Sequence, residues 1–262
     1  MLNILFIGDI NGKAGRKVIK NLLPSLIKEK NICFVIANGE NSAGGFGITK
    51  EKYVELVSSG INVITTGNHI WDKKEAIELL KNESNILRPA NYPENNPGAG
   101  FNVYNIPNSN YKIGVINLIG RIFMPPAECP FLTTQKILNK ISTQTNIIIV
   151  DIHAEATSEK QALGFYLDGK VSAVIGTHTH VQTADERILP NGTGFITDVG
   201  MTGPFDSVIG VEKETIIRRF LTMMPEKFEV ANSNLKLNAV ILSIDETTGK
   251  TKAIERINMK YE

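Results

Sequence analysis

The sequence has no long hydrophobic run and very little cysteine. No apolar stretch approaches the ~20 residues that a membrane-spanning helix needs. The opening run MLNILFIGD ends in Gly-Asp without a basic leader or a cleavage site, so we expect a first buried strand and not a signal peptide. The two cysteines, Cys33 and Cys129, are too few for a disulfide framework or a thiolate metal cluster. We therefore expect a cytoplasmic protein with no membrane segment.

The sequence also lacks an excess of either charge. Its 28 Lys and Arg residues nearly balance 27 Asp and Glu residues, for a net charge of +1. There is thus no strong nucleic-acid-binding signature, and an anionic substrate would have to be attracted locally. The 262 residues are 42% hydrophobic, which is enough to bury one large α/β core. We expect a single domain over residues 1–262.

Short apolar runs alternate with segments of helical periodicity. The runs are bounded by Gly, Asn or Asp and predict buried strands at 3–7, 32–37, 63–66, 113–118, 147–152, 173–175 and 239–244. The periodic segments predict helices at 13–28, 49–58, 73–81, 133–142 and 158–167. Ser158 and Gln161 form a capping-box signature at the start of the last helix. The alternation through the first third predicts βαβ units and a largely parallel sheet.

A second sheet is predicted from the later part of the chain. The runs 100–106 and 112–118 flank the turn sequence Pro107-Asn-Ser-Asn and resemble a hairpin. Strand-rich stretches follow at 173–196 and 235–257. Two sheets packed face to face, with helices outside, would bury these runs economically. The expected fold class is therefore α/β with two sheets.

Polar side chains of the metal-ligating type follow five of the predicted strands. They are Asp9, Glu40 and Asn41, Asn68 and His69, His153 and Glu155, and His178 and His180. All four histidines of the chain belong to this set. Because ligands bind at the carboxyl ends of parallel strands, where distant residues meet, we expect these side chains to lie close together.

Each of these residues has an ordinary explanation when it is taken alone. Asp9 could cap the next helix, Glu40 could be a turn residue, and a lone His153 could be a buried, hydrogen-bonded histidine. The pair His178 and His180 is harder to explain, because alternate positions of an extended segment point to the same side and can chelate. Coincidence at five strand ends is the less economical interpretation, so we infer a metal site.

The ligand types indicate which ions would bind. Mixed carboxylate, imidazole and amide groups suit Fe or Mn, with Zn as a further candidate. The number of candidate ligands exceeds the three that a mononuclear catalytic site uses, so we expect two divalent metal ions. A bridging carboxylate has to hold two such ions ~3.5–4 Å apart, and Glu40 is our choice. Two divalent ions carry more positive charge than Asp9, Glu40 and a bridging hydroxide carry negative charge. This surplus of positive charge favours a phosphate oxyanion.

The motifs GDI, GEN, GNH and GTHTH together resemble those of the calcineurin-like metallophosphoesterases. Longer segments resemble the YmdB-like branch of bacterial phosphodiesterases over nearly the whole chain: GENSAGGFGIT, TGNHIWDKKE, RPANYP, DIHAEATSEK, GTHTHVQTADERILP and ITDVGMTGPFDSVIG. Asn11 stands where the broad superfamily has a histidine, and Glu40 stands where it has an aspartate. Both departures are shared with the YmdB-like branch, and Asn41 could supply the ligand missing at Asn11.

The resemblance implies a four-layer α/β/β/α sandwich, which matches the two sheets expected above. It also implies that His69 is the general acid and that Glu40 bridges the two ions. The other ligands would divide into Asp9, Asn41 and His180 for one ion, and Asn68, His153 and His178 for the other.

The function favoured by these implications is hydrolysis of a phosphodiester by metal-bound hydroxide, with His69 protonating the leaving oxygen. The resemblance implies a small-molecule substrate, a cyclic nucleotide such as a 2′,3′-cyclic nucleotide monophosphate. Two alternatives stay open: a phosphomonoesterase or nucleotidase, and a regulatory nucleotide-sensing protein that acts through a partner. Association into a homo-oligomer is compatible with the sequence.

Groups that would hold the base or the phosphate are less apparent. The candidates for an aromatic platform are Phe46, Trp71, Tyr92 and Phe205, each of which could equally be a packing residue. Arg88 and Arg121 could clamp a phosphate, although Arg88 precedes Pro89 in a turn and could instead cap carbonyls.

Overall fold

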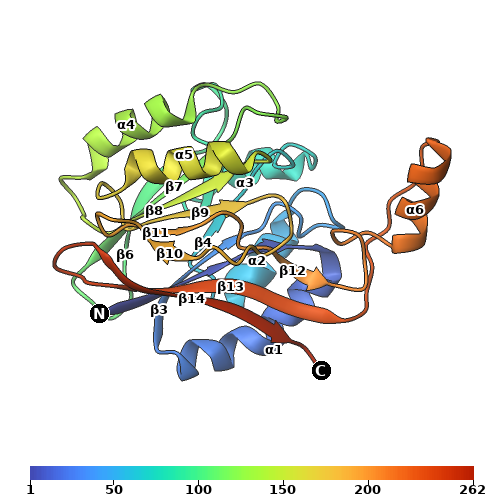
Figure 1. Cartoon of the computed structure of the whole chain (residues 1–262), viewed down its shortest axis with the longest axis horizontal. Coiled ribbons are helices and arrows are strands. Elements are labelled where there is room, and N and C mark those ends of the chain that lie inside the picture. The colour runs from blue at the N-terminus through green and yellow to red at the C-terminus, as the bar shows by residue number, and fades with distance from the viewer.

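Two β-sheets lie face to face in the computed structural model, which describes residues 1–262, and helices cover the outer face of each sheet (Figure 1). This arrangement confirms the expected α/β/β/α sandwich. No helix combines the length and the apolar character that crossing a membrane requires.

The first sheet has eight strands in the order β2-β12-β13-β1-β3-β4-β5, with β14 paired to β13. Its strands are β1 (Leu2–Ile7), β2 (Asp9–Ile10), β3 (Ile32–Asn38), β4 (Val63–Thr65), β5 (Ile86–Leu87), β12 (Met201–Pro204), β13 (Leu235–Ile244) and β14 (Thr251–Lys260). As predicted, β1, β3 and β4 are parallel, and the short strand β5, which was not predicted, extends them in the same direction. The assignment of 235–257 to the second sheet is wrong, because β13 pairs antiparallel with β1. Strand periodicity identifies a strand, but its partner depends on contacts between residues far apart in the sequence.

The second sheet has six strands in the order β10-β11-β9-β8-β7-β6. They are β6 (Phe101–Asn105), β7 (Lys112–Ile119), β8 (Ile148–His153), β9 (Ala173–Thr177), β10 (Arg187–Ile188) and β11 (Gly194–Ile196). The predicted hairpin is confirmed, since β6 and β7 pair antiparallel. The strands β7, β8, β9 and β11 are parallel.

Six helices connect the strands: α1 (Gly12–Glu29), α2 (Lys50–Ser58), α3 (Glu75–Asn82), α4 (Pro130–Ile141), α5 (Thr157–Leu167) and α6 (Lys213–Thr222). The first five correspond to predicted helices. The predicted capping box is wrong, because α5 begins one residue before Ser158 and its cap position is Ala156, which makes no side-chain bond. The helix α6 was not predicted. It stands away from the body of the molecule (Figure 1), and Ile216 is its only buried residue.

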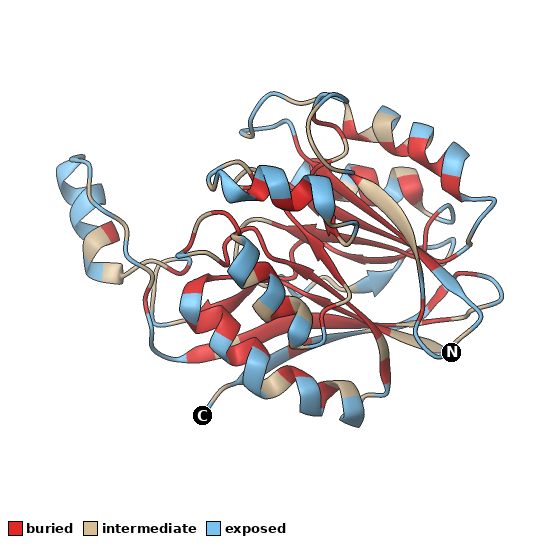
Figure 2. Ribbon diagram, turned by 180° about the vertical axis from the view of Figure 1, so that it is seen from behind, coloured by how far each residue is buried: buried red, intermediate tan, exposed pale blue.

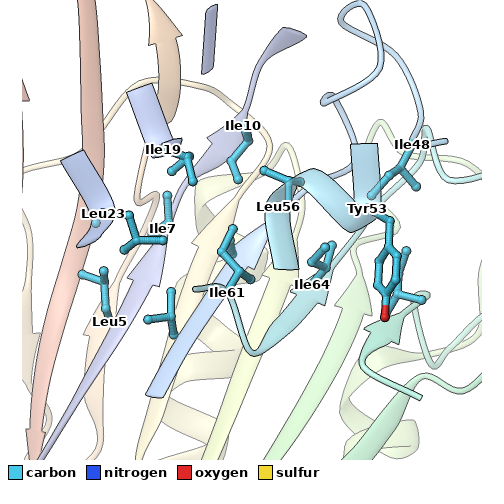
Figure 3. Packing of buried hydrophobic residues seen from close by; sticks show 14 of the residues in the cluster. Leu5, Ile7, Ile10, Ile19, Leu23, Ile48, Tyr53, Leu56, Ile61 and Ile64 are labelled. Atoms are coloured by element: carbon cyan, nitrogen blue, oxygen red, sulfur yellow. The ribbon is translucent and has the colours of Figure 1, made fainter. Parts of the chain in front are cut away.

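Three hydrophobic clusters fill the three spaces between the layers. In the first, side chains such as Ile19, Leu23 and Leu56 from α1 and α2 pack against the first sheet (Figure 3). A second cluster lies between the two sheets, and a third joins the second sheet to α4 and α5. Both faces of each sheet are therefore covered, as the buried central strands show (Figure 2). This explains why the strands are continuous apolar runs and do not alternate with polar residues.

Candidate metal centre

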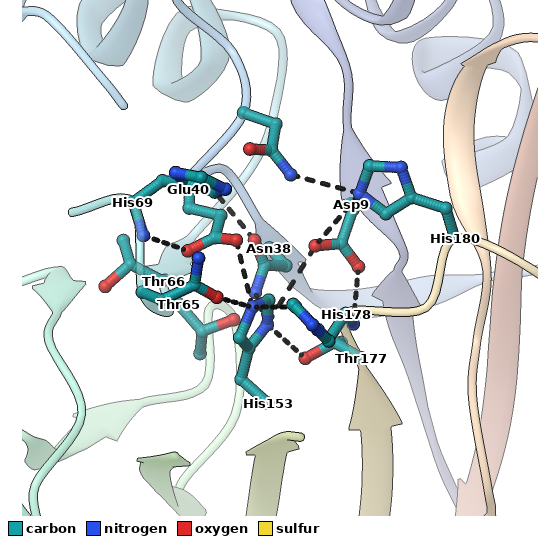
Figure 4. A network of polar contacts seen from close by, with 12 residues as sticks. Asp9, Asn38, Glu40, Thr65, Thr66, His69, His153, Thr177, His178 and His180 are labelled. Carbon is teal, nitrogen blue, oxygen red and sulfur yellow. Dashed lines mark hydrogen bonds and ion pairs between the residues drawn. The ribbon is translucent and has the colours of Figure 1, made fainter. Parts of the chain in front are cut away.

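Strand ends of both sheets supply a polar cluster at one edge of the sandwich (Figure 4). From the first sheet come Asp9, Glu40 and Asn68, after β1, β3 and β4. From the second sheet come His153, which ends β8, and His178, which follows β9. The predicted meeting of strand ends is thus present in the structure, and it spans two sheets instead of one.

His153 lies at the centre of this cluster and is fully buried. Its Nε2 atom is 2.9 Å from Glu40 Oε1, 3.1 Å from His178 Nδ1 and 3.1 Å from Asn68 Oδ1. Ligand atoms of Glu40, His153 and His178 all lie within 4.8 Å of one another. Nitrogen and oxygen lone pairs converge here from three separate strand ends, which is the arrangement that a bound cation requires.

Asp9, Asn41 and His180 form a second group beside the first. His180 Nε2 is 3.1 Å from Asn41 Nδ2 and 3.8 Å from Asp9 Oδ1. Asp9 Oδ1 is also 3.9 Å from His153 Nδ1, which joins the two groups. Their memberships coincide with the two ligand sets that the family resemblance implies. Glu40 contacts the His153 group, and its role as a bridge stays a prediction.

The expectation that His178 and His180 lie on one extended segment is wrong. The strand β9 ends at Thr177, and the backbone φ angles are 104° at His178 and 66° at His180, in the left-handed region. The chain bends at His178 and Thr179, and His178 contacts His153 while His180 contacts Asn41. One short turn therefore supplies a histidine to each group.

A buried ion pair holds this histidine turn. Lys160 Nζ on α5 is 2.7 Å from Asp198 Oδ2, and both side chains are excluded from solvent. The same oxygen accepts a hydrogen bond from Thr179 N at 3.0 Å, and Asp198 Oδ1 accepts one from Gly200 N at 2.8 Å. Left-handed residues other than glycine cost ~1–3 kcal/mol each and persist only where the surroundings hold them. Sequence reasoning did not assign a role to Lys160 or Asp198; the available signal was an aspartate within the motif ITDVG.

Asp151 and Thr177 orient the imidazole of His153. Thr177 Oγ1 donates to Asp151 Oδ1 at 2.7 Å and lies 2.9 Å from His153 Nδ1. With its proton directed to Asp151, the hydroxyl accepts from Nδ1–H, which leaves the Nε2 lone pair for the cluster. Asn38 Nδ2 also approaches Nδ1 but at 3.3 Å, so we assign the tautomer from the shorter Thr177 contact. The signal in the sequence was an acid inside the apolar run IIIVDIH.

Gly67 provides the space that His153 occupies. A Cβ atom at this position would lie 2.2 Å from His153 Cδ2, far inside van der Waals contact. The glycine of the GNH motif is therefore required by a close approach of backbone and ring.

Three buried oxygens in the cluster lack a hydrogen-bond donor: Asp9 Oδ1, Glu40 Oε1 and Asn41 Oδ1. The short contact of Glu40 Oε1 with His153 Nε2 is favourable only when the imidazole carries a second proton. Leaving carboxylate and amide oxygens buried without partners is costly, and cations placed among them would satisfy all three. The residues present therefore fit divalent metal ions.

The ionisation of the cluster is strongly coupled. Burial raises the pKa of Glu40, but the neighbouring His153 and other contacts outweigh burial and lower the pKa to about 2. Burial lowers the pKa of His153, and Glu40 and Asp9 more than offset this and raise it to about 9. Burial and the positive charge of His153 lower the pKa of His178 to about 3, so that its ring stays neutral. A metal ion at His153 would take the place of the proton, since only neutral imidazole binds metal.

His69 lies at the edge of the cluster and is partly exposed, with 28% of its side chain accessible. Its backbone N–H donates to Glu40 Oε2 at 3.0 Å, and its Nδ1 is 2.8 Å from Asp72 Oδ2. The ring of Phe46 packs edge-on against it, with centroids 4.9 Å apart. The Nε2 atom is left free, as a proton donor would need.

The cluster opens into a pocket of about 400 Å³. None of its lining residues is a lysine or an arginine, while Glu155 and Glu229 both line it. A phosphate would be repelled by such a surface unless bound cations reversed its charge. Of the two interpretations of Arg88, carbonyl capping is confirmed, because its buried guanidinium donates to the carbonyls of Pro89 and Pro97. Arg121 is exposed outside the pocket.

Among the candidate aromatic platforms only Phe46 lines the pocket. Trp71 and Tyr92 pack against each other in the first hydrophobic cluster, with ring centroids 6.1 Å apart. Phe205 lies under Lys236, whose ammonium nitrogen is 4.9 Å from the ring centroid. For these three residues the packing interpretation holds.

The four-layer sandwich agrees with the metallophosphoesterase fold that the resemblance of the motifs implies. The same fold occurs in the structure of a 5′-nucleotidase from Candida albicans SC5314, with a TM-score of 0.58 and 11% identity over 100% of this chain and 52% of that one. This likeness concerns the fold alone.

The chain belongs to the YmdB-like family, whose profile, described as "YmdB-like protein", matches residues 5–257. The chain is 49% identical over 256 residues to the 2′,3′-cyclic-nucleotide 2′-phosphodiesterase of Bacillus subtilis (strain 168), covering 98% of this chain and 96% of that protein. It is also similar to the crystal structure of a novel phosphatase from Mycoplasma pneumoniae, with a TM-score of 0.93 and 39% identity over 99% and 93% of the two chains. The resemblance found in the motifs is thereby confirmed.

Proposed function

We propose that this protein is a metal-dependent phosphodiesterase that hydrolyses cyclic nucleotides, in particular 2′,3′-cyclic nucleotide monophosphates. The observation that carries the proposal is the pocket, in which converging metal-ligand side chains form the floor and no lysine or arginine is available to bind a phosphate. The name of the Bacillus subtilis relative supports the substrate class.

Two divalent ions, Fe or Mn and as a further candidate Zn, fit the two groups of ligands. Glu40 would lie between ions held by Asp9, Asn41 and His180 on one side and by Asn68, His153 and His178 on the other. When bound, such ions supply positive charge for the phosphate oxygens and lower the pKa of water.

His69 would donate the proton that the leaving oxygen needs. Its backbone N–H donates to Glu40, and Asp72 accepts from Nδ1, which orients the ring. The free Nε2 can then reach a leaving oxygen in the pocket. This arrangement separates the proton donor from the metal ligands, although Asn68 and His69 are adjacent in the sequence.

The same pocket favours diesters over monoesters. A phosphodiester carries one negative charge, whereas a monoester carries nearly two near pH 7 and would meet the carboxylates of Glu155 and Glu229. The rival phosphomonoesterase or nucleotidase function is supported by the word phosphatase in the name of the Mycoplasma pneumoniae structure. Rates with bis-p-nitrophenyl phosphate and p-nitrophenyl phosphate compare the two directly, and a preference for the monoester would sink the diesterase proposal.

Metal analysis tests the centre itself. Protein purified without chelator and reconstituted with Mn or Fe should contain about two ions per chain and hydrolyse bis-p-nitrophenyl phosphate. Fewer than about two ions on full reconstitution would contradict the binuclear centre.

A regulatory role through a partner stays an alternative, which Glu40→Gln can separate from catalysis. If this variant lost hydrolysis and kept the cellular phenotype, the result would favour the regulatory function over the catalytic one. Homo-oligomer formation and cytoplasmic location stay predictions, and light scattering and fractionation would test them.

A further inference from the structure

One wall of the pocket is apolar. It consists of Phe46 and of four side chains from the two segments that flank α6, namely Ile209, Val211, Phe228 and Val230. None of these five side chains carries a hydrogen-bond donor or acceptor. The pocket thus has a polar floor, formed by the ligand cluster, and beside it this apolar wall.

The two segments that flank α6 are fixed to each other by backbone pairing. Val211 forms bridges with Val208 and Val230. Glu212 N donates to the carbonyl of Glu229 at 2.9 Å. The apolar wall is therefore a short ladder from which α6 projects, and α6 itself is not needed to close the pocket.

The ladder is also fixed to the body of the molecule. Val230 packs so closely on two backbone turns that a Cβ atom at Gly12 or Gly45 would lie 3.0 or 2.8 Å from it. Ile209 has a φ angle of 47°, unusual for a β-branched residue, and its carbonyl accepts from His180 Nδ1 at 2.8 Å. The wall and the metal cluster are thus held at a set separation.

Two members of this wall, Phe46 and Phe228, are aromatic rings. Phe46 contacts the imidazole of His69, with a ring-centroid distance of 4.9 Å and an interplanar angle of 67°. Phe228 is covered on one side by Arg219 of α6, whose guanidinium carbon is 4.8 Å from the ring centroid. Both rings line the pocket, and each packs against a second side chain, His69 or Arg219.

The chemistry of a 2′,3′-cyclic nucleotide relates the wall to His69. Cleavage of the bond to the 2′-oxygen, the bond specified in the name of the Bacillus subtilis relative, requires a proton at that oxygen. The 2′-carbon is bonded directly to the 1′-carbon, which carries the base. A substrate whose 2′-oxygen meets His69 therefore brings its base to the side of the pocket where Phe46 contacts His69.

We propose that the apolar wall is the nucleobase subsite of this enzyme and that it binds bases by stacking and apolar contact. The inference rests on the proposed function. Every base has a π-face, and a wall without donors or acceptors does not read base edges, so purine and pyrimidine cyclic phosphates are both accepted. The floor fixes the cyclic phosphate and the wall fixes the base.

Phe228→Ala tests the subsite, because Phe46 touches the proposed proton donor and its removal would confuse the two roles. Two substrates are compared: adenosine 2′,3′-cyclic phosphate, and 1-O-methyl-ribofuranose 2′,3′-cyclic phosphate, which lacks a base. The matched control is Phe165→Ala, since Phe165 is an exposed ring on α5 with the guanidinium carbon of Arg187 5.6 Å from its centroid. Metal content and melting temperature are measured for each variant.

We expect Phe228→Ala to lower kcat/KM for the nucleotide by about 5-fold to 150-fold, mainly through KM, which is the range of one lost base–aromatic stack. The base-free substrate should change by less than about 2-fold, and Phe165→Ala should change neither substrate. Equal losses on both substrates, or no loss on either, would overturn the subsite while leaving the phosphodiesterase function intact. A wild-type protein that binds metal but hydrolyses neither cyclic phosphate would overturn the proposed function and the subsite with it.

Discussion

Replacing Asp198 by asparagine should release the histidine turn from the fold. The amide keeps the shape of the side chain, but it leaves the buried Lys160 without a counter-charge. Its single oxygen can accept from Thr179 N or from Gly200 N, whereas the carboxylate accepts from both. Removing one partner of a buried ion pair costs ~3–5 kcal/mol, and we expect the free energy of unfolding of the metal-free protein to fall by that amount.

The same substitution should weaken metal binding, because Thr179 lies between the two proposed ligands His178 and His180. Loss of a group that orients a ligand typically lowers metal affinity by ~10–100-fold. Urea unfolding of the metal-free protein gives the first quantity, and calorimetric titration with Mn gives the second.

Two further variants separate the effects of charge and of orientation. Lys160→Met combined with Asp198→Asn removes both charges, so stability should recover while metal affinity stays low. Glu78→Gln breaks an exposed ion pair of similar length, 2.8 Å to Lys81, and should alter neither quantity. Wild-type metal affinity in Asp198→Asn would refute the reasoning, because it would show that the left-handed turn needs no support from this pair.

Three other outcomes are expected. His69→Ala should lower turnover of bis-p-nitrophenyl phosphate by ~10²–10⁴-fold at full metal content, and loss of metal from this variant would instead identify His69 as a ligand. Removing metal with a chelator should lower the melting temperature, and metal at 100 times its Kd should restore ~2.7 kcal/mol per site; a melting temperature indifferent to metal would contradict the centre. Burial raises the pKa of Asp185, but hydrogen bonds from Thr183 and Thr197 bring the pKa below its ordinary value. The ionised carboxylate therefore stabilises the fold at a pH above its unfolded-state pKa of ~3.9. That stabilisation is lost as the pH falls through the folded-state pKa. Asp185→Asn should therefore lose less stability than the wild type below about pH 4 in urea unfolding, and an unchanged acid slope would argue against these bonds.

The strand ends were predictable from the sequence because the signal is local. An apolar run followed by Gly and then Asp9, Glu40 or Asn68 identifies both a buried strand and the polar residue at its end. Parallel strands then bring such residues together without further information. The four layers follow in the same way, since continuous apolar strands require cover on both faces.

What was not predicted depends on contacts that the local pattern does not contain. The apolar pattern of β13 identifies a strand but does not indicate which sheet contains it. Its pairing with β1 places it in the first sheet. The direction of His178 and His180 depends on Lys160 and Asp198, which lie on other elements. The helix α6 does carry helical spacing, but Ile217, Phe220 and Leu221 are exposed and only Ile216 is buried, so it lacks the apolar buried face of the other helices.

The division of the cluster between two sheets bears on how the protein is made. Asp9, Glu40 and Asn68 leave the ribosome early, but His178 and His180 follow only after most of the second sheet, and β13, the partner of β1, comes later still. A partly synthesised chain therefore presents carboxylates and amides without the imidazoles that would complete either group. If both proposed sites bind metal, complete ligand sets would exist only after His180 has been made, so metal binding would coincide with closure of the sandwich.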